Sequence, residues 1–527
     1  MKQKSLMAIS AVVAFVWQLI TFFMDQKIFE VSPISNLPDY IICKAVALAA
    51  SFCFIYMIIS LILPGRKDRF FYRYLTSALI YIPVILIIAI VKIPQGYYTG
   101  DEVNIYNSAV TLTHFTWFYY LTPFFYITSF MLIPHYYAPM IVKCIIMYLV
   151  VAYVVYRADK YFYTGKNPYL ITKPFKIRLG QSVLVLFFLW PVLAYTTSAH
   201  RLPTYFPLYL LLFTILIFDK LEKKSIDLPK ALGLFLLIAV LTQWRTEGIY
   251  LVVLGPLLFI LTYENLNVFK KAVRLKTLPG ILSVILVSLL LQGLIALPQK
   301  TGITQAGSAA NSRLSPLYIY EITNMLREGL DTEKYAEELA SIDKYVSIDA
   351  LNELNENYGD ENYSDTIILF DGQAGTRTDD SSEEYLGFSN AVKTILKENI
   401  PLFLKTRFKA FNYSAVPYKP DFTFTSAGAA FSSLKNDIKF IAYNLYIPIL
   451  IVCFFIIYTI IRKKVYSFLI LCGWLAHWFI VFILAPASYF KYYFPNYILA
   501  YFMIIVFVIG LLYNRANKDK QLPIPLP

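Results

Sequence analysis

Charged residues are scarce in this chain of 527 residues: 15% are Asp, Glu, Lys or Arg, whereas 58% are hydrophobic. So low a charged fraction excludes an ordinary soluble enzyme and indicates a protein that crosses a membrane several times. The net charge is +13. In a soluble protein this charge would suggest a nucleic-acid partner, but here the positions of the basic residues favour another interpretation.

Cysteine and histidine are also rare, with five and four residues. All five cysteines fall within apolar segments, which argues against a disulfide framework or a cysteine metal site outside the membrane. No two histidines stand four residues apart, so we expect no histidine-built zinc site. The sequence also has no glycine-rich loop that would bind a nucleotide phosphate.

Long apolar segments are the main feature that is present. About twelve have roughly the length of a membrane-spanning helix. They lie at 5–24, 41–64, 76–95, 136–157, 179–197, 204–218, 231–244, 249–263, 279–297, 438–461, 466–485 and 495–513. The aromatic-rich stretch 115–133 is expected to form interfacial or re-entrant helices broken at Pro123, and not a thirteenth span.

Lys and Arg are distributed unequally between the two sides of this arrangement. With the N-terminus in the cytoplasm, the cytoplasmic segments hold 26 of them and the short outer loops hold five: Lys27, Lys92, Arg201, Arg245 and Lys491. This asymmetry follows the positive-inside rule, so we expect a plasma-membrane protein with both termini in the cytoplasm. The basic excess is therefore a topology signal, and no nucleic-acid partner is expected.

The predicted organisation has three parts. Residues 1–297 form a transmembrane region with a functional external loop at 96–135, and residues 438–527 form the last transmembrane helices and a cytoplasmic tail. Between them, residues 298–437 form an inserted extracytoplasmic domain, α-rich or α/β, with 21 acidic against 13 basic residues. The overall expectation is an all-α polytopic membrane protein with this one polar insert.

Within the insert, one or two amphipathic helices are expected from residue 331 onward, followed by loops at 355–365 and 371–384. The stretch "ENIPLFLKTRFKAFNYS" predicts an amphipathic helix along the membrane surface. Its apolar and basic residues are Phe403, Phe408 and Phe411, and Lys405, Arg407 and Lys409.

The stretch "GYYTGDEVNIYN" places Asp101 and Glu102 side by side, a few residues beyond the third apolar segment and on the external side. A carboxylate there stays ionised and can act as a general base toward a hydroxyl group. Alternatively, the pair marks the polar boundary where a helix leaves the bilayer.

Three outer loops carry cations against the positive-inside bias. "TTSAHRLPTYFPLY" contains Arg201, "LTQWRTEGIYLV" contains Arg245, and "APASYFKYYFPNY" contains Lys491. Together these charges suit a phosphate or pyrophosphate group. Each could instead be an interfacial side chain that reaches water, and Arg245 could pair with Glu247 in a structural turn. Further candidates for the same pocket are His200, Glu247, Tyr98, Tyr489 and Arg313.

The chain resembles the GT-C superfamily of multispanning glycosyltransferases, which use polyprenyl-phosphate-linked sugars. The resemblance rests on an Asp/Glu pair in an early external loop and on four short stretches. They are "TGDEVNIYNSA", "WRTEGIYLV", "KENIPLFLKTRFKAF" and "PASYFKYYFPNYILAYF".

This resemblance implies a GT-C-like fold with Asp101 as the catalytic base and Glu102 as a supporting carboxylate. Arg245, Arg201 and Lys491 would be ligands of the donor phosphate. The donor would be an undecaprenyl-phosphate-linked sugar held among membrane lipids, and the acceptor a cell-envelope glycan, lipid-linked oligosaccharide or teichoic-type polymer. Transfer of the hexosyl or pentosyl group would invert the anomeric centre. No cofactor is obligatory, and a divalent ion, Mg²⁺ or Mn²⁺, is an alternative.

Two other functions stay open. A polysaccharide polymerase or ligase acting on pyrophosphate-linked glycans would depend on Arg313 and Arg327 in the insert. A lipid or glycan transporter would show charged or Gly/Pro-broken positions in mid-membrane and an internal repeat. The apolar segments are mostly uninterrupted, with Lys44 and Lys143 near their ends, and no repeat is evident.

Overall fold

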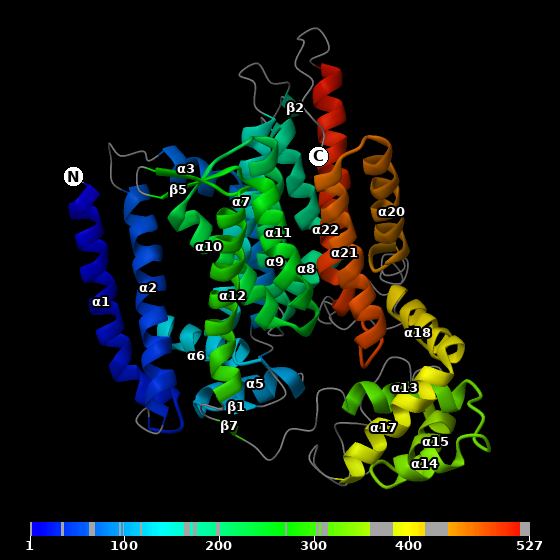
Figure 1. Cartoon of the computed structure of the whole chain (residues 1–527). Helices are drawn as coiled ribbons and strands as arrows, with labels where there is room; N and C mark the ends of the chain where they lie inside the picture. The colour runs from blue at the N-terminus through cyan, green and yellow to red at the C-terminus, as the bar shows by residue number, and fades with distance from the viewer. Residues whose placement is uncertain are drawn as a thin grey trace. The chain divides into compact units, whose positions relative to one another are not determined.

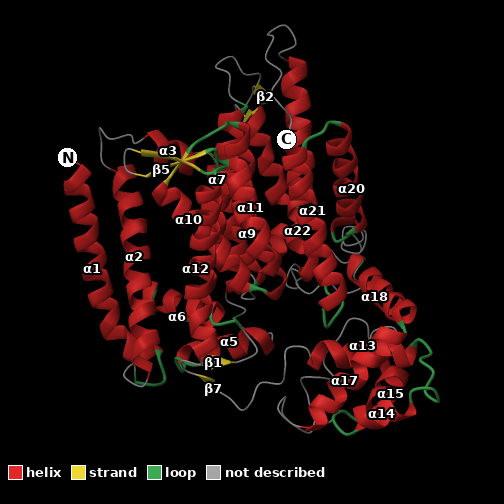
Figure 2. Cartoon of the chain, in the orientation of Figure 1, coloured by secondary structure: helices red, strands yellow, loops and turns green. Residues whose placement is uncertain are grey.

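The computed structural model describes most of the chain, and helices dominate it (Figure 1; Figure 2). The described residues are 3–32, 36–62, 69–93, 96–97, 100–115, 119–162, 169–171, 177–196, 201–268, 271–301, 305–306, 315–358, 383–416 and 441–516. Every statement below about what the structure contains refers to these residues.

Seven of the described helices are long and apolar enough to cross a membrane. They are α1 (Gln3–Ile28), α2 (Leu37–Ile62), α7 (Ala138–Tyr161), α9 (Leu202–Leu221), α12 (Leu278–Thr301), α21 (Val465–Leu484) and α22 (Phe490–Ala516). The pair η4 (Leu179–Phe188) and α8 (Trp190–Thr196) would pass the same test together but is bent by 67°. The chain is therefore an all-α, multi-pass membrane protein.

Four shorter apolar helices fall in the remaining predicted segments: α4 (Ile82–Lys92), α10 (Leu228–Trp244), α11 (Leu251–Thr262) and α20 (Tyr446–Ile461). A fifth, α6 (Leu121–Leu132), lies in the aromatic-rich stretch 115–133. Each of the twelve predicted segments contains a long helix, the bent pair or one of these short helices. The count of twelve spans stays a prediction, because the short helices have fewer residues than a straight crossing needs.

Two compact units make up the chain. Unit 1 consists of residues 1–306, 451–473 and 498–527, and unit 2 consists of residues 307–450 and 474–497. The division passes through α21 and α22, so each of these helices contributes to both units. Unit 2 holds most of the segment predicted as an inserted domain.

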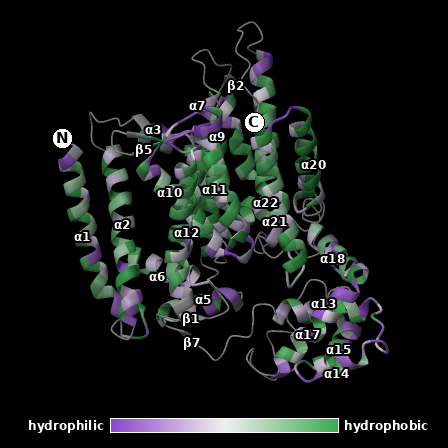
Figure 3. Ribbon diagram, in the orientation of Figure 1, coloured by the Kyte–Doolittle hydropathy of each residue, from purple (hydrophilic) through white to green (hydrophobic). Residues whose placement is uncertain are grey.

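The helices of unit 1 differ in how far they are enclosed by protein. In α9, 83% of the apolar window is buried, whereas the corresponding share is 28% in α1 and α12 and 17% in α2. Exposed apolar side chains on these outer helices are what a hydrocarbon environment accommodates (Figure 3). Helix α9 is therefore a central helix of unit 1, and neighbouring segments pack around its N-terminus.

Helix α6 is enclosed by protein instead of lying exposed at an interface. Nine of its residues are buried. Pro123 lies in its first turn and does not break it, because a first-turn residue has no intrahelical N–H bond to lose. This corrects the predicted break at Pro123. At the same end, the hydroxyl of Tyr120 donates a hydrogen bond of 2.9 Å to Asp39 of α2.

The C-terminal end of α6 is capped by side chains of α1. The indole N–H of Trp17 donates to the carbonyl of Leu132 at 2.9 Å, and the amide of Gln18 donates to the carbonyl of Met131 at 3.3 Å. The last carbonyls of a helix have no partner within it, and in a membrane protein they need one from elsewhere in the protein. These bonds fix α6, which lies beneath the site described below.

Short elements connect the helices of unit 1. They are α3 (Arg69–Thr76), η2 (Leu79–Tyr81), α5 (Gly100–Val110), η5 (Thr246–Tyr250), β1 (His114–Phe115), β2 (Tyr169–Ile171), β3 (Ile177–Arg178), β4 (Ile226–Asp227), β5 (Asn265–Val268), β6 (Lys271–Arg274) and β7 (Gln305–Ala306). Strand β1 pairs in parallel with β7, β2 pairs with β3, and β4, β5 and β6 form a sheet in that order. The β1–β7 pair ties the chain after α5 to the chain after α12.

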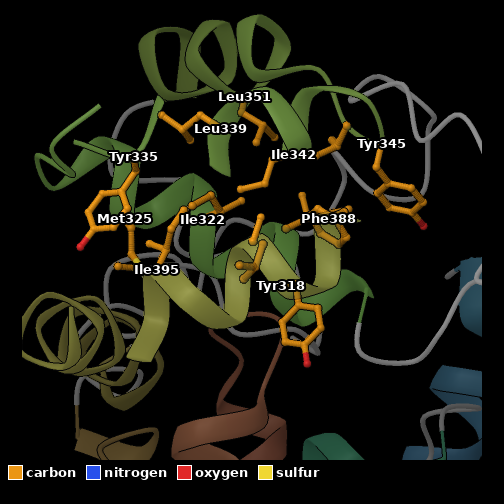
Figure 4. Close-up of a cluster of buried hydrophobic side chains, with 14 of the residues drawn as sticks. Tyr318, Ile322, Met325, Tyr335, Leu339, Ile342, Tyr345, Leu351, Phe388 and Ile395 are labelled. Atoms are coloured by element: carbon orange, nitrogen blue, oxygen red, sulfur yellow. The ribbon is translucent and has the colours of Figure 1, made fainter. Parts of the chain in front are cut away.

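Unit 2 contains five helices besides the parts of α20, α21 and α22 that it includes. They are α13 (Ser315–Arg327), α14 (Ala336–Asp343), α15 (Ile348–Tyr358), α17 (Glu383–Glu398) and α18 (Ile400–Ala415). Their apolar faces meet in one core, in which Ile322, Ile342 and Phe388 are among the buried residues (Figure 4). The predicted helices after residue 331 and at 398–414 are confirmed as helices.

Parts of the two predicted loops in the insert are helical. Helix α15 continues to Tyr358 and α17 begins at Glu383, so the ends of both predicted loops are wrong. The remaining loop residues, 359–382, lie outside the described residues. Among those that are described, unit 2 is helical, which agrees with the α-rich form of the prediction.

A buried ion pair joins two helices of unit 2. The guanidinium of Arg407 in α18 contacts the carboxylate of Glu321 in α13, and both side chains are almost fully buried. Arg407 also donates hydrogen bonds to the carbonyls of Phe482, at 2.5 Å, and Ala485, at 3.0 Å. Burial raises the pKa of Glu321, while Arg407 and Thr406 act in the opposite direction. The prediction that Arg407 lies on the exposed basic face of α18 is therefore wrong.

Breaking this ion pair should destabilise unit 2. We expect Glu321→Gln and Arg407→Met each to cost about 3–5 kcal/mol, because either change leaves a charged or polar group buried without its partner. The double variant should recover part of the lost stability, although the carbonyls of Phe482 and Ala485 still lack the hydrogen bonds from Arg407. The measurement is the midpoint temperature of thermal unfolding in detergent.

Lys405→Met is the matched control on the same helix. Its side chain is half exposed and pairs with Glu328 at 3.0 Å, and such a pair contributes about 0–1 kcal/mol. A Glu321→Gln variant as stable as this control would contradict the role given to the buried pair.

Candidate functional site

The acidic pair lies in the first turn of α5, where the helix dipole favours negative charge. The two carboxylates have different surroundings. The side chain of Asp101 is 32% exposed, whereas Glu102 is fully buried. Adjacent helical residues point about 100° apart, so one can face solvent while the next faces the core. Of the two, Asp101 is the one that a soluble substrate could reach.

Asp101 forms an ion pair with Arg201. The shortest distance between the guanidinium and the carboxylate is 3.7 Å, and the Arg201 side chain is 20% exposed. Arg201 precedes the first residue of α9. The distance is longer than a hydrogen bond, and a partly exposed pair of this kind contributes about 0–1 kcal/mol. The contact is therefore a weak one compared with a buried, hydrogen-bonded ion pair.

Behind this pair, Glu102 lies near a buried lysine. Lys143 of α7 has no exposed surface. Its ammonium group donates to the hydroxyl of Tyr126 at 3.4 Å and lies 5.0 Å from the centre of the same ring. Glu102 is among the groups that interact electrostatically with Lys143. An acidic and a basic side chain are thus buried where each acts on the other, which is the arrangement that buried ionisable groups require.

Arg245 has a different environment from Arg201. Its guanidinium donates to both carboxylate oxygens of Glu247, through Nε at 3.2 Å and Nη2 at 2.5 Å. It also lies 5.8 Å from the ring centre of Tyr205, and only 5% of the residue is exposed. A buried, forked pair of this type is much stronger than an exposed one. Arg245 is thus held by Glu247, as the structural alternative anticipated.

The turn between Arg245 and α11 depends on a glycine. A Cβ atom at Gly248 would lie 2.3 Å from the carbonyl oxygen of Leu241 and 3.2 Å from the hydroxyl of Tyr205. The first distance is impossible for a real side chain, so the close return of the chain onto α10 requires glycine here. This accounts for the glycine in the "WRTEG" stretch.

Aromatic contacts connect these groups within unit 1. The indole of Trp244 donates to the carbonyl of Arg201 at 3.0 Å, and its ring packs edge-on against Phe125 at 5.7 Å. Phe125 in turn lies 5.9 Å beneath the ammonium of Lys143. Trp244, Arg201 and Lys143 are therefore linked by one series of packing contacts.

Tyrosines surround the chain just before α5. The ring centres of Tyr97 and Tyr106 are 4.9 Å apart, and Tyr136 packs edge-on against both. The hydroxyl of Tyr97 donates to the carbonyl of Tyr136 at 2.8 Å. Burial raises the pKa of Tyr97, and Glu102 is among the groups that raise it further. Tyr97 therefore stays neutral and holds the approach to α5 in place.

The remaining predicted site residues belong to unit 2 or lie outside the described residues. Lys491 lies in unit 2, with its ammonium 4.1 Å above the ring centre of Tyr489. Three further candidates lie outside the described residues: Tyr98, His200 and Arg313. Asp101, Glu102, Arg201, Arg245 and Glu247 all lie in unit 1. Among them, Arg245 contacts Glu247 at 2.5 Å and Arg201 contacts Asp101 at 3.7 Å.

Sequence reasoning missed Lys143. It was placed near the end of an apolar segment, whereas the structure buries it completely. A lysine inside an apolar helix usually faces the protein interior and has a partner, and this rule could have identified it. No sequence signal indicates Trp244 or Tyr205, because their contacts depend on tertiary packing.

Within the described part of the chain, no three His, Cys, Asp or Glu side chains lie together as a metal site requires. A Mg²⁺ or Mn²⁺ site therefore gains no support there. In comparisons with known proteins, no family model, no curated protein and no solved structure matches this chain.

The partnership between Glu102 and Lys143 can be tested without a substrate. We expect Lys143→Met and Glu102→Gln each to lower stability, by about 3–5 kcal/mol, because each leaves the other polar group buried beside apolar atoms. The double variant should regain part of the loss. The measurement is the temperature at which half of the detergent-solubilised protein stays monodisperse.

Lys160→Met serves as the control, since Lys160 lies on the same helix and is exposed. If the stability lost in the double variant equals the sum of the losses in the two single variants, Glu102 and Lys143 act independently and the pairing is refuted.

Proposed function

We propose that the chain is an inverting glycosyltransferase that moves a sugar from a polyprenyl-phosphate donor to a hydroxyl group outside the cytoplasm. The observation that carries the proposal is the Asp101–Arg201 pair: an accessible carboxylate 3.7 Å from an accessible guanidinium. A base and an anion-binding group side by side are what this reaction needs. The GT-C resemblance of the sequence points to the same residues.

In the proposed reaction, the Asp101 carboxylate accepts the proton of the acceptor hydroxyl. The hydroxyl oxygen forms a bond to C1 of the sugar while the bond from C1 to the phosphate oxygen breaks on the opposite face. The electron pair of the broken bond remains on the polyprenyl phosphate, and Arg201 stabilises the added negative charge. Attack opposite the leaving group inverts the configuration at C1.

The proposal gives different roles to the other charged residues. Glu102 is buried near Lys143, so it supports the position of Asp101 and does not meet the acceptor. Arg245 would bind phosphate only by giving up Glu247, so Arg201 is the better ligand. Lys491 stays a proposed third ligand of the donor phosphate.

The membrane setting supports a lipid-linked donor. Arg201 directly precedes the apolar helix α9, and Arg245 directly follows the apolar helix α10, so both would lie near the level of lipid phosphates. The bias of Lys and Arg in the sequence puts this side outside the cytoplasm. The donor class is therefore an undecaprenyl-phosphate-linked hexose or pentose, and the acceptor class is a cell-envelope glycan or teichoic-type polymer.

The proposal predicts that Asp101→Asn abolishes most of the transfer. We expect a loss of about 10²–10⁴-fold, as for removal of a general base. Arg201→Met should also reduce transfer, through weaker stabilisation of the leaving phosphate. The assay uses purified protein in nanodiscs, undecaprenyl-phosphate-linked sugars and extracted envelope glycan, and measures the undecaprenyl phosphate released.

Asn104→Ala is the matched control, because Asn104 is exposed on the same helix three residues further on. It should retain the wild-type rate. An Asp101→Asn variant that transfers sugar at the wild-type rate would refute Asp101 as the base. Absence of release with every monophosphate donor, but release with pyrophosphate-linked glycan, would favour the polymerase or ligase alternative.

A further inference from the structure

Helix α18 presents an apolar stripe that the described part of unit 2 leaves largely exposed. Ile400, Leu404 and Phe408 are 54%, 36% and 58% exposed. They follow each other at intervals of four residues, so they line up along one side of the helix. Three large apolar side chains in a row on a charged domain need an explanation.

The opposite face of α18 fixes this orientation. Arg407 and Thr406 are buried, and both contact Glu321 of α13. Ala410 and Ser414 continue the buried face one and two turns later. Because the helix is held by this face, the stripe cannot turn inward to join the core of unit 2.

Basic residues run beside the stripe. Lys405 and Lys409 are half exposed, and both pair with the single carboxylate of Glu328, at 3.0 and 2.5 Å. Two ammonium groups share one carboxylate, so this edge of the helix keeps a net positive charge. An apolar stripe with lysines at its border is typical of a helix that lies in the surface of a bilayer.

Contacts inside unit 2 place α18 beside membrane helices. Phe408 packs edge-on against Phe482, in the last turn of α21, at 5.1 Å. Phe411 contacts Tyr446, the first residue of α20, at 5.8 Å, and Tyr493, in the first turns of α22, at 5.4 Å. Helix α18 therefore meets three apolar helices where each begins or ends, which is the level of the membrane surface.

We infer that α18 is a membrane-surface helix, with Ile400, Leu404 and Phe408 inserted among lipid acyl chains and Lys405 and Lys409 at the phosphate groups. The partner is the bilayer itself. This inference is independent of the proposed glycosyl transfer. The sequence predicts a membrane-surface helix here with Phe403, Phe408 and Phe411 as its apolar residues. The structure replaces this set by Ile400, Leu404 and Phe408 as the residues that would enter the lipid.

The test uses the full chain with its five native cysteines replaced and one environment-sensitive fluorophore attached through a new cysteine. Phe408→Cys and Leu404→Cys each place the label on the stripe. Asn352→Cys is the control, since Asn352 is exposed on α15 beside acidic residues. Each labelled protein is reconstituted in liposomes with lipids that carry a nitroxide near the headgroup end of the acyl chain.

We expect the labels at 404 and 408 to lose most of their emission to the nitroxide lipid and little to iodide in the buffer, with the reverse at 352. Equal quenching by iodide at 408 and 352 would overturn the inference. So would protection of 408 and 404 from both quenchers, because another protein surface would then cover the stripe. Two labelled positions keep the test valid if one variant folds poorly.

Discussion

The structure depends on how a largely apolar protein accommodates a few buried charges. In unit 1, Lys143 and Glu102 are both fully enclosed, and Arg157 of α7 pairs with the buried Asp219 of α9 at 3.0 Å. Moving a charge from water into such surroundings costs several kcal/mol unless a partner of opposite sign lies close. Each buried charge therefore restricts which helices can lie side by side, and α7 takes part in both pairings.

This constraint separates the acidic pair into two environments. Glu102 is fully buried and therefore needs a partner within the protein. Its neighbour Asp101 lies at the surface of the same helix turn. The same distinction separates the arginines. Arg245 is held by a buried fork to Glu247, whereas Arg201 has a long and partly exposed contact. The two arginines thus differ in burial and in the length of their contact with a carboxylate.

Hydropathy predicted the helical segments well, because the length and composition of an apolar helix are local properties of the sequence. The α-rich insert and its amphipathic helices followed from composition and period in the same way. The candidate pair Asp101 and Arg201 could also be named from the sequence, as scarce external charges. Their contact could not, since it depends on how α5 packs against the start of α9.

The errors have physical causes that can be stated. Arg407 was grouped with Lys405 and Lys409 by proximity in the sequence. Residues four apart share a helix face, but a residue between them, two positions from each, lies on the other side. Pro123 was taken as a break, yet it is at the one place in a helix where proline is tolerated. Lys143 lies near the end of its apolar segment, as predicted, but its burial depends on tertiary packing and was not foreseen.

The most direct test of the central claim is a structure of the full chain in a lipid nanodisc with bound undecaprenyl phosphate. The account predicts density for the phosphate within hydrogen-bonding distance of Arg201, with the Asp101 carboxylate facing the same space. Density for the phosphate at a site that includes neither Arg201 nor Asp101 would contradict it.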